Sequence, residues 1–138
     1  MKNFIKVAPL ALALIIAPNA HANNNQKIAF VKKMYAEQKR VKDSGVAIQK
    51  YGTAELKQAF RYANSTGFVC IESDPFYNSQ DPNYGASVSY SVNGQGHVVA
   101  NVARHGRSTF VLAQAGNGYK LADIYYREGS LKNNLSNC

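Results

Sequence analysis

Residues 86–126, ASVSYSVNGQGHVVANVARHGRSTFVLAQAGNGYKLADIYY, decide the fold. Apolar and polar side chains alternate along much of this stretch, which is the period of a β-strand with one buried face. Glycine-containing breaks interrupt the alternation three times, and each break is short enough for a hairpin turn. The stretch therefore predicts a meander of four antiparallel strands. Their expected ranges are 86–92, 97–104, 108–114 and 119–126.

Two helices are predicted before the strands. Residues 27–42 carry a broad apolar face with lysines opposite, and residues 53–63 carry an apolar stripe that Thr53 can cap. We expect Gly45 to be the left-handed residue that ends the first helix. Helices that precede a run of strands indicate an α+β domain in which the helices cover one face of the sheet.

Three further segments connect or follow these elements. Residues 68–71 form a short apolar run that fits either a strand or a helical turn, and residues 73–85 contain two Asp-Pro pairs that indicate a structured loop. After the last strand, residues 128–130 predict a turn that takes the chain off the sheet. Leu131 and Leu135 lie four residues apart, which favours a short helical turn packed back on the domain.

The first 22 residues, MKNFIKVAPLALALIIAPNAHA, have the pattern of a secretory signal peptide. Two lysines precede an apolar run that is too short to span a bilayer, and Ala20-His21-Ala22 is a typical cleavage site. An uncleaved membrane anchor is the alternative. Cleavage near Ala22 would leave residues 23–138 as a single periplasmic or secreted α+β domain.

The chain has two cysteines, Cys70 and Cys138. In an exported protein, an even number of cysteines predicts a disulfide bond between them. The alternative is two free thiols, one of them catalytic. A nucleophilic cysteine needs a histidine partner, and only His97 and His105 follow the predicted signal peptide.

The formal net charge of +8 is unevenly distributed. Residues 27–42 contain six lysines and arginines and one acidic residue, Glu37. A nucleic-acid-binding protein would spread its basic residues over a larger face, so this local concentration disfavours nucleic acid as a partner. It favours an acidic protein partner or a weak contact with an anionic membrane surface.

The order of the predicted elements resembles that of the cystatin-like/NTF2-like roll, in which N-terminal helices lie in a curved antiparallel sheet. More narrowly, the chain resembles small exported bacterial proteins of the DUF3828 type. The matching pieces are Phe30-Val31-x-x-Met34-Tyr35, the loop with Ser73-Asp74-Pro75 and Gln80-Asp81, and the strand Tyr119 to Ile124. The resemblance implies a fold and an exported location, and it implies no reaction or cofactor.

Two sets of acidic residues are candidates for a site. Asp74 and Asp81 could line the mouth of a cleft and hold a cation or act as acid and base, although Asp-Pro is also common in plain turns. Asp123 is expected on one face of the last strand with Leu121 and Tyr125, where an unpaired carboxylate would have a raised pKa. The alternative for Asp123 is a structural pairing with a lysine or tyrosine of the helices.

Arg104, His105 and Arg107 crowd one predicted hairpin and could bind a carboxylate or a phosphate. A solvated turn with charges at the sheet edge is the alternative. Neither His97 nor His105 has a metal-ligating neighbour at helical or strand spacing, so no metal is expected.

The sequence contains none of the strong catalytic or cofactor motifs, such as a glycine-rich phosphate loop, a Gly-x-Ser-x-Gly elbow or Cys-x-x-Cys. We therefore expect no cofactor and predict a non-catalytic binding protein for a protein partner or a small ligand. An immunity-type inhibitor of a toxin or enzyme is a concrete form of this prediction. The alternative is a small pocket enzyme, a hydrolase or isomerase, that uses Asp123. The oligomeric state is left open.

Overall fold

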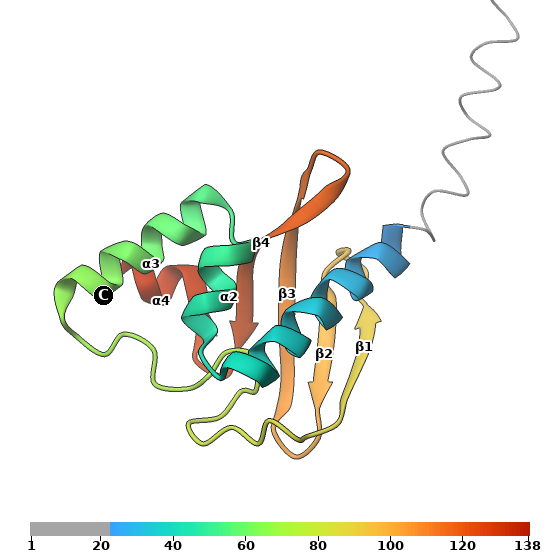
Figure 1. Cartoon of the computed structure of the whole chain (residues 1–138), viewed down its shortest axis with the longest axis horizontal. Helices are drawn as coiled ribbons and strands as arrows, with labels where there is room; N and C mark the ends of the chain where they lie inside the picture. The colour runs from blue at the N-terminus through green and yellow to red at the C-terminus, as the bar shows by residue number, and fades with distance from the viewer. Residues whose placement is uncertain (1–22) are drawn as a thin grey trace, which may run out of the picture.

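The computed structural model describes residues 23–138, so the predicted signal peptide lies outside the described residues. The described chain is an α+β domain, as predicted, with helices first and an open antiparallel sheet after them (Figure 1). No helix in this part of the chain is long and apolar enough to cross a membrane. The elements are a helix over residues 23–41, α2 (Ser44–Tyr51), α3 (Ala54–Thr66), β1 (Val88–Val92), β2 (Val98–Val102), β3 (Gly106–Ala115), β4 (Gly118–Tyr126), β5 (Gly129–Ser130) and α4 (Leu131–Ser136).

The sheet has five strands in the order β1-β2-β3-β4-β5, one more than the four predicted. The first four strands form the expected meander. The fifth strand, β5, is only two residues long and pairs Tyr125 with Ser130 and Tyr126 with Gly129. Because two residues show no alternation of apolar and polar side chains, the sequence pattern predicted only a turn at this place.

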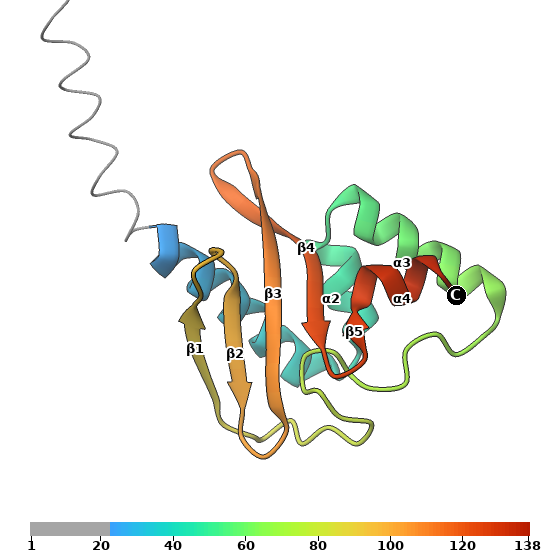
Figure 2. The ribbon, with the colours of Figure 1, turned by 180° about the vertical axis from the view of Figure 1, so that it is seen from behind.

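The helix over residues 23–41, called here the N-terminal helix, lies across one face of the sheet in front of β1, β2 and β3 (Figure 1). Seen from behind, that part of the sheet has no helix over it, while α3 and α4 lie beyond β4 (Figure 2). The N-terminal helix buries one side of each turn against the strands, which is why its apolar positions recur at helical spacing. Its buried apolar residues are Val31, Met34 and Tyr35, and facing them in the sheet are Val98, Ala100, Val102 and Phe110.

The short helix α2 was missed by the sequence analysis, which placed a glycine cap at its start. Asp43 caps α2 by accepting a hydrogen bond from the backbone N–H of Gly45 at 2.9 Å. The left-handed residue between the two helices is Lys42, with φ 58°, and Gly45 lies inside α2. Gly45 is needed there for space, because a Cβ atom would lie 2.6 Å from Cζ of Phe60.

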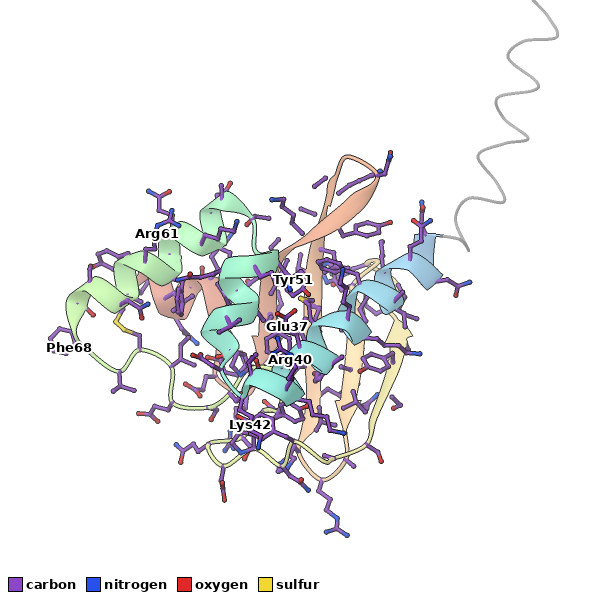
Figure 3. The ribbon with its side chains drawn as sticks, viewed as in Figure 1. Glu37, Arg40, Lys42, Tyr51, Arg61 and Phe68 are labelled. Atoms are coloured by element: carbon purple, nitrogen blue, oxygen red, sulfur yellow. A yellow bond between two sulfur atoms is a disulfide. The ribbon has the colours of Figure 1, made fainter. Side chains whose placement is uncertain are left out.

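A cluster of polar side chains joins α2 to the N-terminal helix (Figure 3). Glu37 accepts hydrogen bonds from the Tyr51 hydroxyl at 2.6 Å and from Lys50 Nζ at 2.9 Å. The hydrogen bond from Tyr51, supported by Lys50, lowers the pKa of Glu37. Tyr51 also packs edge-on against Phe30, with ring centroids 5.6 Å apart. These contacts fix α2 beside the N-terminal helix.

The loop over residues 73–85 is tied to the core by buried polar contacts. The Tyr35 hydroxyl donates to the backbone oxygen of Phe76 at 2.5 Å, and Ser108 Oγ donates to that of Pro75 at 2.6 Å. The Tyr35 ring packs edge-on against the Phe76, Tyr77, Tyr90 and Phe110 rings. These contacts attach the loop to both the N-terminal helix and the sheet.

Candidate functional site

The most exposed large apolar side chains among residues 23–138 are Phe68 and Val69, which are 76% and 82% exposed. They follow the end of α3, where Gly67 has a φ of 76° and turns the chain away from the helix. Figure 3 shows Phe68 at the far end of α3 from the sheet. We call residues 67–71 the tip. A pair of exposed apolar neighbours is unusual on a protein surface and points to an interaction site.

A disulfide bond between Cys70 and Cys138 holds the tip, which confirms the predicted pairing; the two Cα atoms are 5.5 Å apart. Thr66 Oγ1 accepts a hydrogen bond from the backbone N–H of Phe68 at 3.2 Å, and the Tyr62 hydroxyl donates to the backbone oxygen of Cys138 at the same distance. A disulfide is typical of a protein from an oxidising compartment. Because the tip is already fixed, a partner would pay little entropy to order it.

A groove of about 470 Å³ lies between the tip, the start of α2 and the end of α3, and we call it the tip groove. Phe60, Phe68, Ile71 and Leu135 supply apolar wall. None of its lining residues, all of them within the described chain, is a lysine or an arginine. The groove therefore combines apolar surface with an absence of positive charge in a chain that is strongly basic.

Three carboxylates line the tip groove: Asp43, Glu72 and Asp74. Asp43 uses one oxygen to cap α2, and the exposed Glu72 side chain lies at the rim. Asp74 is deeper, and burial raises its pKa. Its oxygens accept hydrogen bonds from the backbone N–H of Phe76 at 2.8 Å and from Nε2 of Gln38 at 2.7 Å. The groove is thus negatively charged at its rim.

Asp74 and Asp81, predicted together at a cleft mouth, have different environments. Asp74 lines the tip groove and organises the loop, whereas the exposed Asp81 is not among the groove residues and its backbone N–H donates to Ser79 Oγ at 3.1 Å. An isolated pairing of Asp74 with Ser79 closes the turn between them. The contacts of Asp74 are those of a structural turn residue that also faces a groove.

Asp123 has a structural role in this fold. It is 6% exposed and accepts hydrogen bonds from Ser130 Oγ at 2.5 Å, from its neighbour Ile124 at 2.8 Å and from the backbone N–H of Lys132 at 2.9 Å. The carboxylate therefore anchors the start of α4, and its partners differ from the helix lysine or tyrosine that we expected. Ser130 and Lys132 reach Asp123 because β5 and the start of α4 fold back beside β4.

A bulge explains why the predicted face of the last strand was wrong. The pairing of β4 with β3 passes from Leu121 opposite Leu112 to Asp123 opposite Val111, which leaves Ala122 as an extra residue. Alternation is interrupted there, so the expected shared face of Leu121, Asp123 and Tyr125 does not form. Leu121 is fully buried in the core, whereas Tyr125 is 50% exposed.

Arg104, His105 and Arg107 lie on and beside the turn between β2 and β3. The two arginines are exposed, and Arg104 has a φ of 70°. The backbone oxygen of His105 accepts a hydrogen bond from Nδ2 of Asn78 at 2.6 Å. Within residues 23–138 these three side chains form no ion pair, and they do not line the tip groove. The arrangement is that of a solvated turn.

Sequence reasoning missed the tip. Residues 68–71 form neither of the elements that the apolar run predicted, and they leave α3 as an irregular segment. One feature of the sequence could have indicated the tip. The apolar run lies directly after Gly67, which ends a helix, and surrounds Cys70, and its residues do not alternate with polar ones as those of a half-buried strand would. An apolar run with no expected partner element indicates an exposed patch.

Comparisons of the chain with models of protein families, with curated proteins and with solved structures found no match. Among the described residues, no group of three histidine, cysteine or acidic side chains is placed to hold a metal ion. The tip groove, with its apolar wall and acidic rim, is therefore the feature from which a function can be inferred.

Proposed function

We propose that this chain is a non-catalytic binding protein that docks a protein partner in the tip groove. The exposed pair Phe68–Val69, held by a disulfide beside an acidic groove, carries the proposal. Interfaces are built from a few well-packed apolar anchors surrounded by a polar rim. Burial of one such apolar side chain contributes about 1.5–3 kcal/mol, so the two residues together would supply a large part of a binding energy.

The charge of the groove defines the chemistry of the partner. Asp43 and Glu72 place negative charge beside the apolar wall. A matching segment presents an apolar side chain next to a lysine or an arginine. Rim charges of this kind act more on the rate of association and on partner choice than on affinity. A toxin or an enzyme that this chain inhibits, as an immunity-type protein would, is the form of partner that we propose.

The proposal includes an exported location and a fold family. The signal-peptide pattern of residues 1–22 and the disulfide support a periplasmic or secreted protein. A helix lying across an antiparallel sheet supports a cystatin-like/NTF2-like roll of the DUF3828 type (Figure 1). The alternative function, a pocket enzyme that uses Asp123, gains no support from the contacts of that residue, because both of its oxygens accept hydrogen bonds from the protein itself.

Site-specific photo-crosslinking in the native host tests the proposal. A photoreactive phenylalanine analogue is placed at position 69, or at position 125 as the control, since Tyr125 is also exposed but lies outside the tip groove. We expect a protein adduct of one defined mass from position 69 and none from position 125. The double variant Asp43→Asn/Glu72→Gln should reduce the yield of that adduct, while asparagine retains the helix cap. Equal crosslinking at both positions, or none at position 69, would overturn the proposal.

A further inference from the structure

The outer edge of β1 is open. Among residues 23–138, β1 pairs with β2 and with no other strand. The backbone groups of Ser87 and Asn93 bond to the β2 side, to Ala103 and His97. In an antiparallel pair, the backbone N–H and C=O groups of successive residues point alternately toward and away from the neighbouring strand. The backbone groups of Val88, Tyr90 and Val92 therefore point away from β2. The edge therefore offers three residues with free donors and acceptors to another strand.

A second groove lies beside this edge, with a volume of about 210 Å³, and we call it the edge groove. It separates the N-terminal helix from β1 and the residues that lead into β1. It is lined by Tyr35, by three further tyrosines and by two lysines. None of its lining residues carries a carboxylate. The two lysines and three further tyrosines are Lys32, Lys39, Tyr77, Tyr84 and Tyr90.

The lysines are placed to meet side chains of an added strand. Lys32 and Lys39 are seven residues apart, so they lie on one side of the N-terminal helix. Lys32 Nζ is 5.5 Å from the centroid of the Tyr90 ring, directly over a β1 residue. Within the described chain neither lysine forms an ion pair. Lysines at a sheet edge discourage pairing with neutral or basic strands, and they leave acidic strands as the matching class.

We propose that an extended acidic segment of a partner protein adds to β1 as a further strand of the sheet. Its backbone would pair with Val88, Tyr90 and Val92. Alternate side chains of an added strand point to the face that the N-terminal helix covers, where carboxylates would meet Lys32 and Lys39. This surface is separate from the tip groove and has the opposite charge, so it goes beyond the function proposed above.

The test uses a fluorescent peptide of nine alternating valine and glutamate residues and the folded chain, residues 23–138, with its disulfide intact. We expect saturable binding that weakens as salt rises, since the lysines are exposed. Lys32→Gln/Lys39→Gln should weaken binding by about tenfold or more. The matched control is Lys33→Gln/Arg40→Gln, which removes the same charge from the same helix at positions that do not line the edge groove.

Backbone pairing is tested with two N-methylated peptides. Methyl groups on alternate amides remove the donors on one edge of the peptide strand, and the second peptide carries them on the other edge. We expect one peptide to lose binding and the other to keep it. Three outcomes would overturn the proposal: equal weakening by the two double variants, equal binding of the two methylated peptides, or no binding of the acidic peptide. Substitution of Phe68 and Val69 should leave this binding unchanged, which separates it from the tip groove.

Discussion

The tip groove and the edge groove lie on the same small domain and use opposite chemistry. The tip groove has acidic residues, exposed apolar side chains and a disulfide, whereas the edge groove has lysines, tyrosines and a free strand backbone. The net charge of +8 agrees in sign with the edge groove and is opposite to the charge of the tip groove. Because salt screens exposed charges beyond a Debye length of about 8–10 Å, the charge within each groove should matter more for a partner than the net charge of the chain.

The two grooves share the loop over residues 73–85, which supplies Asp74 to the tip groove and Tyr77 and Tyr84 to the edge groove, but otherwise they depend on different parts of the fold. The tip groove lies where the helices meet the chain end, and Cys138 closes it covalently. The edge groove depends on the packing of Tyr35, a residue of the N-terminal helix, against Tyr90 and Phe110 of the sheet. Perturbations outside the shared loop should therefore leave the other groove intact, and the predictions for Cys138 and for the tip test this separation.

The largest effect is expected from Cys138→Ser. The disulfide joins residues 68 positions apart, and closing a loop of that length contributes about 4 kcal/mol to the free energy of unfolding in the chain-entropy model. Chemical denaturation without reductant should show this loss, and binding at the tip groove should weaken while binding at the edge groove persists. The control is Ser136→Ala, at the last residue of α4 and two residues before Cys138. Unchanged stability, or equal loss of binding in both grooves, would contradict the comparison.

The next effect is expected from Asp123→Asn. Asparagine keeps an oxygen for the backbone N–H groups of Ile124 and Lys132, which both donate to Oδ1. It puts an NH2 group where Oδ2 accepts from the Ser130 hydroxyl, so that buried hydroxyl loses its charged acceptor. We expect the free energy of unfolding to fall by about 2–3 kcal/mol. Asp81→Asn, at an exposed position, is the control and should change it by less than about 0.5 kcal/mol. Retained stability with lost binding in either groove would show that Asp123 acts in a site.

Asp74→Asn should stabilise the protein at neutral pH, by up to about 1 kcal/mol. Oε1 of the buried Gln38 has no hydrogen-bond partner within the described chain, and an asparagine amide could donate to it after rotation of the side chains. The measurement is denaturation of both forms across the acidic pH range.

The pH dependence has a definite sign. Burial raises the pKa of Asp74, so ionisation costs more in the folded state than in the unfolded state. The stability linked to Asp74 is fully present below the usual carboxyl pKa of about 3.9 and is lost as the pH rises through the raised value. The advantage of the variant should therefore grow as the pH rises through this window. An advantage that shrinks with rising pH would contradict the assignment.

The smallest effect on stability is expected from Phe68→Ser/Val69→Ser. Both side chains are largely exposed, so the free energy of unfolding should change by less than about 0.5 kcal/mol. Binding at the tip groove should be lost, and the acidic peptide should still bind the edge groove. Titration of the double variant with the acidic peptide and with a basic peptide of alternating leucine and lysine residues checks this. A large loss of stability would mean that the tip is part of the core.

The sequence predicted the features that depend on local patterns. Alternation located the first four strands, the spacing of Leu131 and Leu135 located α4, and cysteine counting paired Cys70 with Cys138. Each of these features repeats over several residues or follows from the number of cysteines alone. The α+β class followed from the order of the elements.

The features that were missed depend on contacts that no periodic pattern of the sequence describes. The bulge at Ala122 and the two-residue β5 leave no periodic pattern, yet together they decide what Asp123 contacts. The position of the tip after Gly67 was a local signal, but its exposure depends on where α3 ends relative to α4. Both candidate grooves are formed between elements far apart in the chain, and no local pattern describes the space between them.

The most direct measurement is an NMR titration of the isotope-labelled domain with two peptides, one of alternating leucine and lysine and one of alternating valine and glutamate. The account predicts that the basic peptide shifts amide signals of residues 43–45, 60–64 and 68–74. The acidic peptide should shift those of residues 32–39 and 84–92. Shifts of the same residues by both peptides would contradict the account. So would no shifts with either peptide at about 1 mM, a concentration that half-saturates a site with a binding free energy of about −4 kcal/mol.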